Sequence, residues 1–504
     1  MNYNTLSGSA KLYKKVGLLG TGQMVASGEM PNIAIITTLN AFEHKRLIES
    51  VGFGVRSCGG AVNVFYTPFF GFSNKTNPMT AKYTDSFRRV AASNAEAIIK
   101  TNLIDGVIVV TDCDITAAGI IEGAARANCP VLVISTGTFD FSADMSKGFN
   151  AFQIPGAVTG GKLNLKDSED MLKDVFFPHG IRGDFNSTSS FFIVAEAMGL
   201  SVPGASLCKV DSGNHFRAAV ATGEQMCKSA KDLISPRKFL TRENLGNAIA
   251  LCLSIGADIG ALSHFTNLVK IYDPKIPHEL ISEYTTKTPL LVAPDNQTCN
   301  YLNKIGINSI YKKLASTPKL IDETVIAYNG EKLRSILTET QPAELEPISK
   351  AARAVLCKGS AVGLGGYAQP TSQTPVSISG KAWVYDNLEA ADKALLSGSI
   401  SNGVIVVHNC VDTYVTCLAY AIEGMQKQND IAIITDGLCE KTSCLVVTRC
   451  TPDSFANQEF ANIQNGDVLE IDLAKGRLNS NVLAKEQKHR EKRNSVIKPA
   501  IYFS

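Results

Sequence analysis

The residues with the most reactive chemistry in this sequence are a cysteine and the two aspartates beside it. Asp112, Cys113 and Asp114 stand at the end of the apolar run DGVIVVTD, which spans residues 105–112. A deprotonated thiol is a nucleophile or a metal ligand, and carboxylates act as bases or bind hard cations. None of the thirteen cysteines belongs to a CxxC pair or to a Cys/His array with zinc spacing. We therefore expect no zinc site, and we expect most cysteines to be small buried side chains.

Two glycine-rich segments resemble phosphate-binding loops but lack essential residues. Residues 20–22 (Gly-Thr-Gly) begin like a dinucleotide fingerprint, yet Val25 stands at the third glycine position and would prevent close helix–strand packing. Residues 156–163 approach a P-loop, but Leu163 replaces the hydroxyl residue that would hold magnesium, and no strand precedes the segment. We therefore expect no nucleotide site in either place.

Alternating strands and helices must position the cluster at 112–114. Runs of β-branched residues predict strands at 31–39, 61–67, 105–112 and 130–136, and apolar residues at helical spacing predict helices at 41–57, 84–102 and 115–128. This alternation indicates a mostly parallel sheet with helices on both faces. Sites in such sheets form where strand carboxyl ends meet helix amino ends, so the site is expected at the end of 105–112.

The rest of the chain divides into a helical part, a linker and a second domain. Residues 180–265 are rich in alanine and helical in pattern, whereas 359–380 are rich in Gly, Ser, Thr and Pro, as linkers are. Short strands follow, and the last pair predicts a hairpin that turns at 475–476. We predict an α/β protein with a mostly parallel sheet and helical segments in an N-terminal domain (1–358), then the linker, then a smaller β-rich C-terminal domain (381–504) with a charged tail.

Composition and charge exclude several classes of protein. The chain has 504 residues, of which 45% are hydrophobic and 19% charged, so it is neither disordered nor fibrous. Lys+Arg is 49 and Asp+Glu is 47, which gives no electrostatic reason to expect nucleic acid or membrane as a partner. No apolar run reaches the roughly 18 residues of a membrane span, and no secretory leader pattern opens the sequence. We therefore expect a cytoplasmic protein with reduced thiols.

Four segments, in order along the chain, resemble the dihydroxy-acid dehydratase and phosphogluconate (sugar-acid) dehydratase family. Residues 105–136 are similar to the family's strand ending in Gly-Cys-Asp-Lys, its small-residue helix and its Ser-Gly-Gly strand. Residues 180–206 resemble its Cys-Gly-Gly-Met segment, and 430–443 resemble its Ala-Leu-Ile-Thr-Asp-Gly-Arg-Phe-Ser-Gly-Gly-Thr segment. The hairpin at 466–479 resembles the family's C-terminal end. The matches keep their order and spacing over about 31–487, so the resemblance implies the family's fold.

The resemblance implies elimination of water from a 2,3-dihydroxy acid. In the family an iron–sulfur cluster polarises the departing hydroxyl, a magnesium ion holds the carboxylate, and a serine takes the α-proton. Of the family's three cluster cysteines, only the one at Cys113 is retained. The first falls in a segment without cysteine, TTLNAFEHKRL, and the third falls on Arg182, which has no lone pair to give iron. We therefore expect no cluster and no other cofactor.

The ligands of the family's cation are also replaced. The aspartate of its Ser-Asp-Gly segment falls on Phe72, and the lysine that follows Gly-Cys-Asp falls on Ile115. The glutamate of its Pro-Glu-Met segment falls near Tyr414. Only Asp114 keeps a carboxylate among these four positions, so we expect no bound metal.

The base and the substrate-binding loops differ in the same way. The family's serine falls on Glu440, and the two glycines after it become Lys441 and Thr442. Side chains at these positions fill the space through which the family's backbone approaches its substrate. The Ser-Thr-Asn of the family's anion loop becomes Asp-Ile-Gly at 258–260, where the aspartate repels a carboxylate or phosphate.

Two functions remain open on this pattern of losses. The first is a catalytically inactive homologue, a pseudoenzyme that keeps the scaffold for a binding, assembly or regulatory role. In it, Phe72, Tyr414 and an ion-paired Arg182 fill the vacated pocket. The second is a cluster-free lyase that acts on a small hydroxy acid at a rebuilt site. There Arg182 holds a carboxylate, Glu440 acts as the base and Cys113 as the nucleophile.

Further polar side chains come to the pocket on the same segments: Asp112, Asp184, Cys439, Lys441, His179 and His408. Asp112 stands where the family has glycine, so a new anion accompanies the new cation, Arg182. A buried guanidinium needs a carboxylate beside it, and we expect Arg182 to pair with Asp112 or Asp114. Ordinary packing or surface roles are expected for three other histidines, His215, His264 and His278.

The resemblance also implies a homo-oligomer, at least a dimer. The apolar segments 184–206 and 243–265 supply more hydrophobic helix surface than one sheet can cover, and an isologous contact is the usual way to bury such surface. We expect no nucleic acid and no membrane as partners. The identity of a small-molecule ligand does not follow from the sequence.

Overall fold

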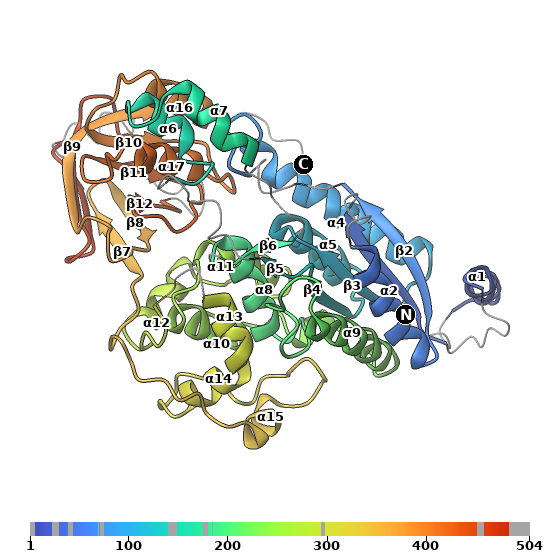
Figure 1. Cartoon of the computed structure of the whole chain (residues 1–504). Helices are drawn as coiled ribbons and strands as arrows, with labels where there is room; N and C mark the ends of the chain where they lie inside the picture. Colours follow the sequence, from blue (N-terminus) through green and yellow to red (C-terminus); the bar gives the residue numbers. More distant parts are fainter. Residues whose placement is uncertain are drawn as a thin grey trace. The chain divides into compact units, whose positions relative to one another are not determined.

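The described residues form two compact units, each built from separate stretches of the chain (Figure 1). The computed structural model describes residues 6–22, 30–38, 44–68, 70, 75–139, 149–174, 180–183, 185–293, 298–450 and 458–482. Within these ranges, no helix is long and apolar enough to cross a membrane. The units are composed as follows: unit 1 of Met1–Phe72, Thr84–Ala143 and Phe177–Ala352, and unit 2 of Ser73–Tyr83, Asp144–Phe176 and Arg353–Ser504.

A four-stranded parallel sheet forms the centre of unit 1. Its strands are β1 (Asn32–Thr38), β2 (Ala61–Thr67), β3 (Gly106–Thr111) and β4 (Val131–Ser135). They lie in the order β2-β1-β3-β4, and β1, β3 and β4 are buried along their whole length. The strand order reverses direction between β1 and β3, which is where open sheets of this kind bind ligands at their carboxyl ends. The predicted parallel α/β sheet is confirmed.

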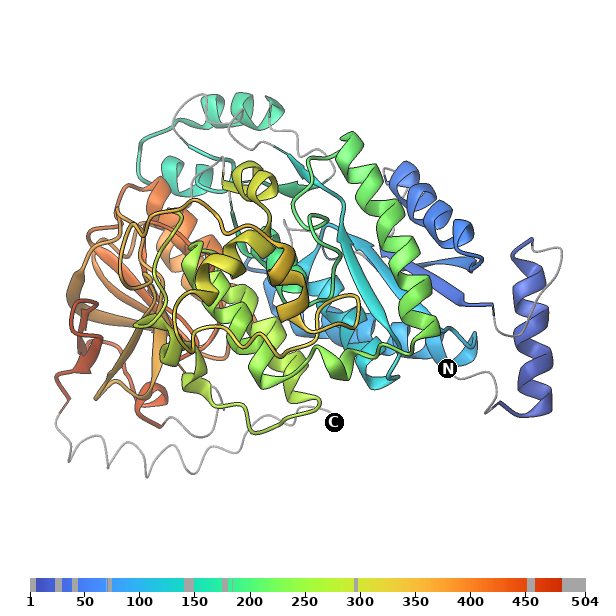
Figure 2. The same ribbon diagram turned by 90° about the horizontal axis from the view of Figure 1, so that it is seen from below.

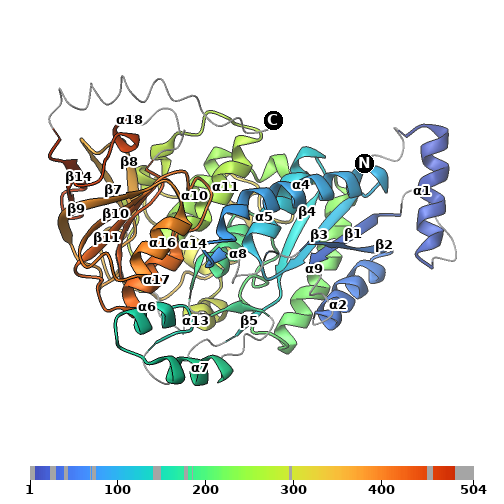
Figure 3. The same ribbon diagram turned by 90° about the horizontal axis from the view of Figure 1, so that it is seen from above.

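Helices cover both faces of this sheet. The side chains of α2 and α9 share one apolar core with β1, β3 and β4, whereas α5 packs on the other face with α4 outside it (Figure 3). The bounds of these helices are α2 (Lys45–Ser57), α4 (Thr84–Thr101), α5 (Asp114–Arg126) and α9 (Gly213–Lys231). Every α5 residue from Asp114 to Ala125 is buried. The start of α5 therefore lies at the buried carboxyl edge of β3.

Two further helices of unit 1, α8 and α11, also contact α5. Helix α8 packs against α10 and α11, and all three are largely buried. The segments 184–206 and 243–265 therefore do not present the uncovered apolar surface that we expected, because these helices bury it within unit 1. The other elements are α1 (Gly8–Gly20), β5 (Thr138–Phe139), β6 (Ile181–Arg182), α8 (Ser187–Ala197), η5 (Pro236–Lys238), α10 (Arg242–Ser254), α11 (Gly260–Lys270), η6 (His278–Ile281), α12 (Ser282–Thr285), α13 (Thr298–Ile305), α14 (Ile307–Ala315) and α15 (Leu333–Glu339).

An eight-stranded mixed sheet forms unit 2, in the order β12-β11-β10-β9-β13-β14-β7-β8. Strand β9 joins its two halves, because it pairs antiparallel with β13 and then parallel with β10. Tyr367 and Thr448 exchange two backbone hydrogen bonds of 2.8 Å, which brings β8 beside the end of β12 and curls the sheet closed. The strands are β7 (Val355–Gly359), β8 (Val362–Ala368), β9 (Ser377–Tyr385), β10 (Gly403–Val407), β11 (Ile431–Thr435), β12 (Leu445–Val447), β13 (Val468–Asp472) and β14 (Arg477–Ser480).

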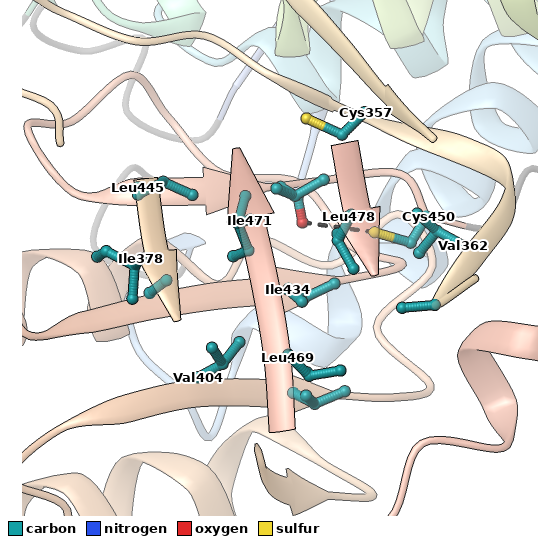
Figure 4. Close-up of a cluster of buried hydrophobic side chains, with 14 of the residues drawn as sticks. Cys357, Val362, Ile378, Val404, Ile434, Leu445, Cys450, Leu469, Ile471 and Leu478 are labelled. Carbon is teal, nitrogen blue, oxygen red and sulfur yellow. Dashed lines mark hydrogen bonds between the residues drawn. The ribbon is translucent and has the colours of Figure 1, made fainter. Parts of the chain in front are cut away.

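Unit 2 has two apolar cores, and its β-rich character is confirmed. One core lies among the strands, and Figure 4 shows part of it, including Cys357 and Cys450. The other lies between the parallel strands and helices α16 and α17. Helix α6 lies directly against α17, since a Cβ atom on Gly156 would come within 1.9 Å of the carbonyl oxygen of Ala421. The non-strand elements are η3 (Ala81–Tyr83), α6 (Ile154–Thr159), α7 (Leu165–Asp174), α16 (Leu388–Leu396), α17 (Thr416–Gly424) and α18 (Gln458–Ala461).

The segment 359–380, which we expected to be a linker, forms strands instead. It contains β8 and the first residues of β9, and it lies inside the third stretch of unit 2, which already begins at Arg353. Its glycines serve close packing, because a Cβ atom on Gly366 would lie 2.7 Å from Val447 and 2.8 Å from Cys450. The expected hairpin is present, with β13 and β14 antiparallel on either side of the turn.

Candidate functional site

The predicted cluster lies where β3 ends and α5 begins. Cys113 is the N-cap residue of α5, and its sulfur accepts a hydrogen bond from the backbone N–H of Thr116 at 3.4 Å. The backbone N–H of Cys113 donates to the hydroxyl oxygen of Thr111 at 3.2 Å. These contacts fix the sulfur at the carboxyl edge of the sheet, where the sequence predicts the site.

The Cys113 thiol lies in an apolar cluster. Its Sγ atom donates a hydrogen bond to the carbonyl oxygen of Phe70 at 2.8 Å. Phe70, Cys113 and Ile115 form a buried cluster, against which Phe87 packs with its ring centroid 4.7 Å from that of Phe70. Cys113 is therefore arranged as a buried thiol, and Ile115 contributes only apolar surface.

Asp114 belongs to a polar group that the sequence analysis missed. Its Oδ2 atom accepts a hydrogen bond from the Ser187 hydroxyl at 3.1 Å and lies 3.9 Å from Nε2 of His264. All three side chains are buried. We expected a packing or surface role for His264, but its place one turn after 258–260 could have identified it. Residues i and i+4 share one face of a helix, and α11 begins at Gly260.

Asp258, expected to repel anions, is held by a backbone N–H group and a serine hydroxyl. Its Oδ1 atom accepts from the N–H of Gly260 at 2.7 Å, and its own N–H donates to the Ser190 hydroxyl at 2.9 Å. The side chain is buried. Asp258 therefore stabilises the first turn of α11 and joins this turn to α8.

Arg182 is buried in the short strand β6, opposite Phe139 of β5. Strand β6 contacts α8, the helix that begins at Ser187. Burial of a guanidinium requires anionic neighbours, so an ion pair of Arg182 with Asp112 or Asp114 stays a prediction. Three predicted site residues, Phe72, Asp184 and His179, lie outside the described residues.

Glu440, at the position of the family's serine, forms a buried ion pair within unit 2. Its Oε1 atom lies 3.3 Å from Nζ of Lys75, and both side chains are 1% exposed. The hydroxyl of Tyr420 donates to Oε2 at 3.2 Å, and the Glu440 N–H donates to the Thr416 hydroxyl at 3.0 Å. Lys75 also lies 4.5 Å from the ring centroid of Tyr414. No sequence pattern identifies Lys75, because its partners are distant in the chain.

The structure divides the predicted site residues between the two units. Asp112, Cys113, Asp114, Ile115 and Arg182 belong to unit 1, and Tyr414, Cys439, Glu440 and Lys441 belong to unit 2. Tyr414 is fully buried, while Cys439 and Lys441 are partly buried on either side of Glu440. Among the residues that the structure describes, no three His, Cys, Asp or Glu side chains are grouped as a metal site.

This fold, with predicted site residues at the carboxyl end of β3, is that of a known class of enzymes. The chain is a member of the dihydroxy-acid/6-phosphogluconate dehydratase family: the family's N-terminal domain matches residues 30–336 and its C-terminal domain matches residues 343–502. The dihydroxy-acid dehydratase of Pyrococcus abyssi is 26% identical over 492 residues, which cover 92% of this chain and 89% of that protein. The dihydroxy-acid dehydratase of Carboxydothermus hydrogenoformans is 25% identical, with 91% and 87% covered. The resemblance noted in the sequence is thereby confirmed.

Proposed function

We propose that this chain is a catalytically inactive homologue of the dehydratases. It keeps the family scaffold for a binding, assembly or regulatory role and holds no iron–sulfur cluster. The observation that carries this proposal is the hydrogen bond from the Cys113 thiol to the carbonyl of Phe70. A cluster ligand is a thiolate directed at iron, whereas this sulfur contacts a carbonyl oxygen and packs against Phe70 and Ile115. The residue at the family's third cysteine position, Arg182, has no lone pair to offer.

The base position supports the same proposal. A general base needs a free lone pair within reach of the substrate proton. Both carboxylate oxygens of Glu440 are already engaged, one by Lys75 and one by Tyr420, in a place without solvent access. The donor set thus fits neither the cluster nor the cation of the family, and Glu440 has the contacts of a structural anion.

Iron and sulfide analysis after anaerobic purification and reconstitution tests the proposal. We expect colourless protein with substoichiometric iron, and no dehydration of 2,3-dihydroxy acids. A dihydroxy-acid dehydratase prepared in parallel serves as the control that reconstitution works. Roughly two or more irons per chain, with the absorbance of a cluster, would overturn the proposal.

A cluster-free lyase that acts on a small hydroxy acid is the second candidate. The contact of Asp114 with Ser187 and His264 favours it, because a buried carboxylate beside an imidazole and a hydroxyl can relay a proton. In this reading Arg182 binds the substrate carboxylate, with Glu440 and Cys113 as base and nucleophile. Incubation with a panel of hydroxy acids and a chelator, followed by NMR, separates the candidates. Product that disappears in Arg182→Ala and His264→Gln would establish the lyase.

A further inference from the structure

Cys58 differs from the other cysteines in its exposure. All thirteen cysteines lie in the part of the chain that the structure describes, and only Cys58 is exposed to solvent. It caps the C-terminal end of α2, a helix that covers the opposite face of the sheet from α5 and the candidate site. A dissolved oxidant reacts with a thiol that it can reach, so Cys58 is the first sulfur that such an oxidant meets.

A second cysteine, Cys227, lies beneath the turn that contains Cys58. Its Sγ atom donates a hydrogen bond to the carbonyl oxygen of Val55 at 3.4 Å, and the N–H of Gly60 donates to the same oxygen at 3.0 Å. A Cβ atom on Gly60 would lie 2.6 Å from the Cys227 sulfur. Because Cys58 stands only two residues before Gly60, the exposed cysteine and the buried one lie on the outer and inner sides of one short turn.

Close packing of α2 against α9 holds the turn and Cys227 together. Figure 2 shows α2 and α9 as neighbouring helices, coloured blue and green. A Cβ atom on Gly54 would lie 2.0 Å from the carbonyl oxygen of Val220, and one on Gly223 would lie 2.3 Å from that of Val51. The two helices therefore meet backbone to backbone, which brings the end of α2 as close to α9 as the chain allows.

Lys231 adds a cation to the same turn. Its Nζ atom donates a hydrogen bond to the carbonyl oxygen of Cys58 at 3.4 Å. Residues 227 and 231 are four apart on α9 and share one face of that helix. Burial, and to a lesser extent the nearby Cys58 sulfur, raise the pKa of the Cys227 thiol to about 11, while the Lys231 ammonium group opposes this rise. Cys227 is thus a protonated thiol at neutral pH and is not the first of the two to react.

We propose that Cys58 and Cys227 form a redox modification site, at which a peroxide oxidises Cys58 and Cys227 then forms a disulfide with it. In the first step, the Cys58 thiol and hydrogen peroxide give a sulfenic acid, S–OH, and one water. In the second step, the Cys227 sulfur attacks the Cys58 sulfur, the S–O bond breaks, and the hydroxyl group leaves with the Cys227 proton as a second water. Two thiols are oxidised to one disulfide while one peroxide is reduced to two waters.

The turn after α2 has the freedom that this bond requires. Gly59 has a φ of +76°, and a Cβ atom on it would meet nothing within 4 Å. With glycine at both 59 and 60, Cys58 can turn inward without a clash of neighbouring side chains. The disulfide would join α2 to α9 above the apolar core that both helices share with the sheet. The proposal does not depend on whether the protein is an enzyme.

Peroxide treatment of the full chain, followed by tryptic mapping without reductant, tests the proposal. We expect peptides 57–75 and 218–228, which contain one cysteine each, to be linked and to separate after treatment with dithiothreitol. The linked pair should account for most of the oxidised Cys58. The oxidised chain should also migrate faster in non-reducing electrophoresis, because the bond closes a long loop of the unfolded chain.

Three variants make the test specific. Cys58→Ser should abolish the linked pair and remain folded, because this side chain is exposed. Cys227→Ala should leave a sulfenic acid at Cys58, which dimedone labels. Cys129→Ala is the matched control, since Cys129 is also buried in unit 1, and the linked pair should form as in the wild type. Circular dichroism verifies the fold, and Cys58→Ser alone decides the test if Cys227→Ala does not fold.

Two outcomes would overturn the proposal. In the first, Cys58 of the wild type proceeds to the sulfinic acid, or links to another chain, while peptide 218–228 keeps a free thiol. In the second, Cys58 and Cys227 are both unmodified at peroxide concentrations that already oxidise methionine, which would show that the exposed thiol has no special reactivity.

Discussion

At the scale of single residues, most cysteines are buried, and Cys113 is among them. Ten of the thirteen cysteines are buried, which confirms the expectation that most are small core side chains. Burial raises the pKa of Cys129, Cys208 and Cys357 to about 12 in each case. These cysteines are therefore protonated thiols at neutral pH, and they contribute apolar volume rather than reactivity.

If Arg182 pairs with Asp112 or Asp114 as predicted, Arg182→Ala is expected to lower the free energy of unfolding by about 3–5 kcal/mol, because it leaves a buried carboxylate without its cation. If the partner is Asp112, the double variant Arg182→Ala/Asp112→Asn should recover most of the lost free energy of unfolding. If the partner is Asp114, Arg182→Ala/Asp114→Asn should recover it instead. Urea unfolding followed by circular dichroism measures each difference. An unchanged unfolding midpoint would contradict a structural role and indicate an arginine kept for a ligand.

Lys75→Met should also lower the free energy of unfolding by about 3–5 kcal/mol, since Glu440 then stays buried without its cation. Lys75→Met/Glu440→Gln should be closer to wild type, because the neutral amide can still accept from Tyr420. Lys82→Met is the matched control: Lys82 pairs with Glu389 at the surface, and its loss should change stability little. If Lys75→Met and Lys82→Met lower the free energy of unfolding equally in urea, the buried ion pair contributes no more to stability than the surface pair.

The raised pKa of the Asp392 carboxyl group leads us to expect a pH dependence of stability. Burial on α16 raises its pKa from 3.8 to about 6, so between these values the folded state binds more protons than the unfolded state. This contribution is present at low pH and is lost as the pH rises through about 6. Asp392→Asn should therefore equal wild type near pH 4 and exceed it by about 1–2 kcal/mol above pH 7. Denaturant unfolding at both pH values measures this, with the exposed Asp232→Asn as control. A pH-independent difference would contradict a raised pKa of the partly buried Asp392 carboxyl group.

At the scale of elements, the contact between α4 and α5 depends on glycine. A Cβ atom on Gly119 would lie 2.4 Å from the carbonyl oxygen of Arg88, and one on Gly123 would lie 2.3 Å from that of Ala92. The two helices therefore touch backbone to backbone. Because α5 carries Cys113 and Asp114 at its start, this contact sets where the candidate site lies.

Gly119→Ala should force α4 and α5 apart and lower the free energy of unfolding by about 1–3 kcal/mol. Gly17→Ala is its control on α1, where an added Cβ atom meets nothing within 4 Å. There the change should be neutral or stabilising by up to about 1 kcal/mol. Thermal unfolding of both variants provides the comparison. Similar melting temperatures for Gly119→Ala and Gly17→Ala would mean that α4 and α5 move apart without loss of stability.

The elements that a sequence predicts well are those whose pattern is local. The parallel strands of unit 1 are continuous apolar runs between helical stretches, and the place of Cys113 and Asp114 at the end of β3 follows from that alternation. The strands within 359–380 cannot be predicted in this way, because the role of Gly366 depends on Val447 and Cys450 from elsewhere in the sheet. Lys75 cannot be predicted for the same reason, because only tertiary packing brings it beside Glu440.

At the scale of the whole molecule, the chain enters unit 2 three times, at Ser73, Asp144 and Arg353. The last stretch contains all eight strands, but Lys75 and α6 come from the earlier two. A fragment of residues 353–504 thus lacks both the cation beside Glu440 and the helix that packs on α17.

The isolated fragment 353–504 is expected not to fold cooperatively. It should bind the dye ANS and show a broad thermal transition, because α17 is uncovered and Glu440 has lost Lys75. The full-length protein, measured in the same buffer, is the control. A sharp transition at the melting temperature of the full chain, without dye binding, would show that the earlier stretches are dispensable.

This interleaving also affects synthesis on the ribosome. Helix α6 emerges roughly 250 residues before α17, the helix that it packs against. At about 5–20 residues per second, that interval lasts on the order of 10–50 s. During this time the early stretches of unit 2 have no partner strands or helices from its last stretch. Unit 1 is also incomplete until residue 352 has been synthesised. The yield of folded protein in a cell is therefore expected to depend on the elongation rate and on chaperones that shield α6 until α17 is synthesised. Measurements of equilibrium stability do not report this yield.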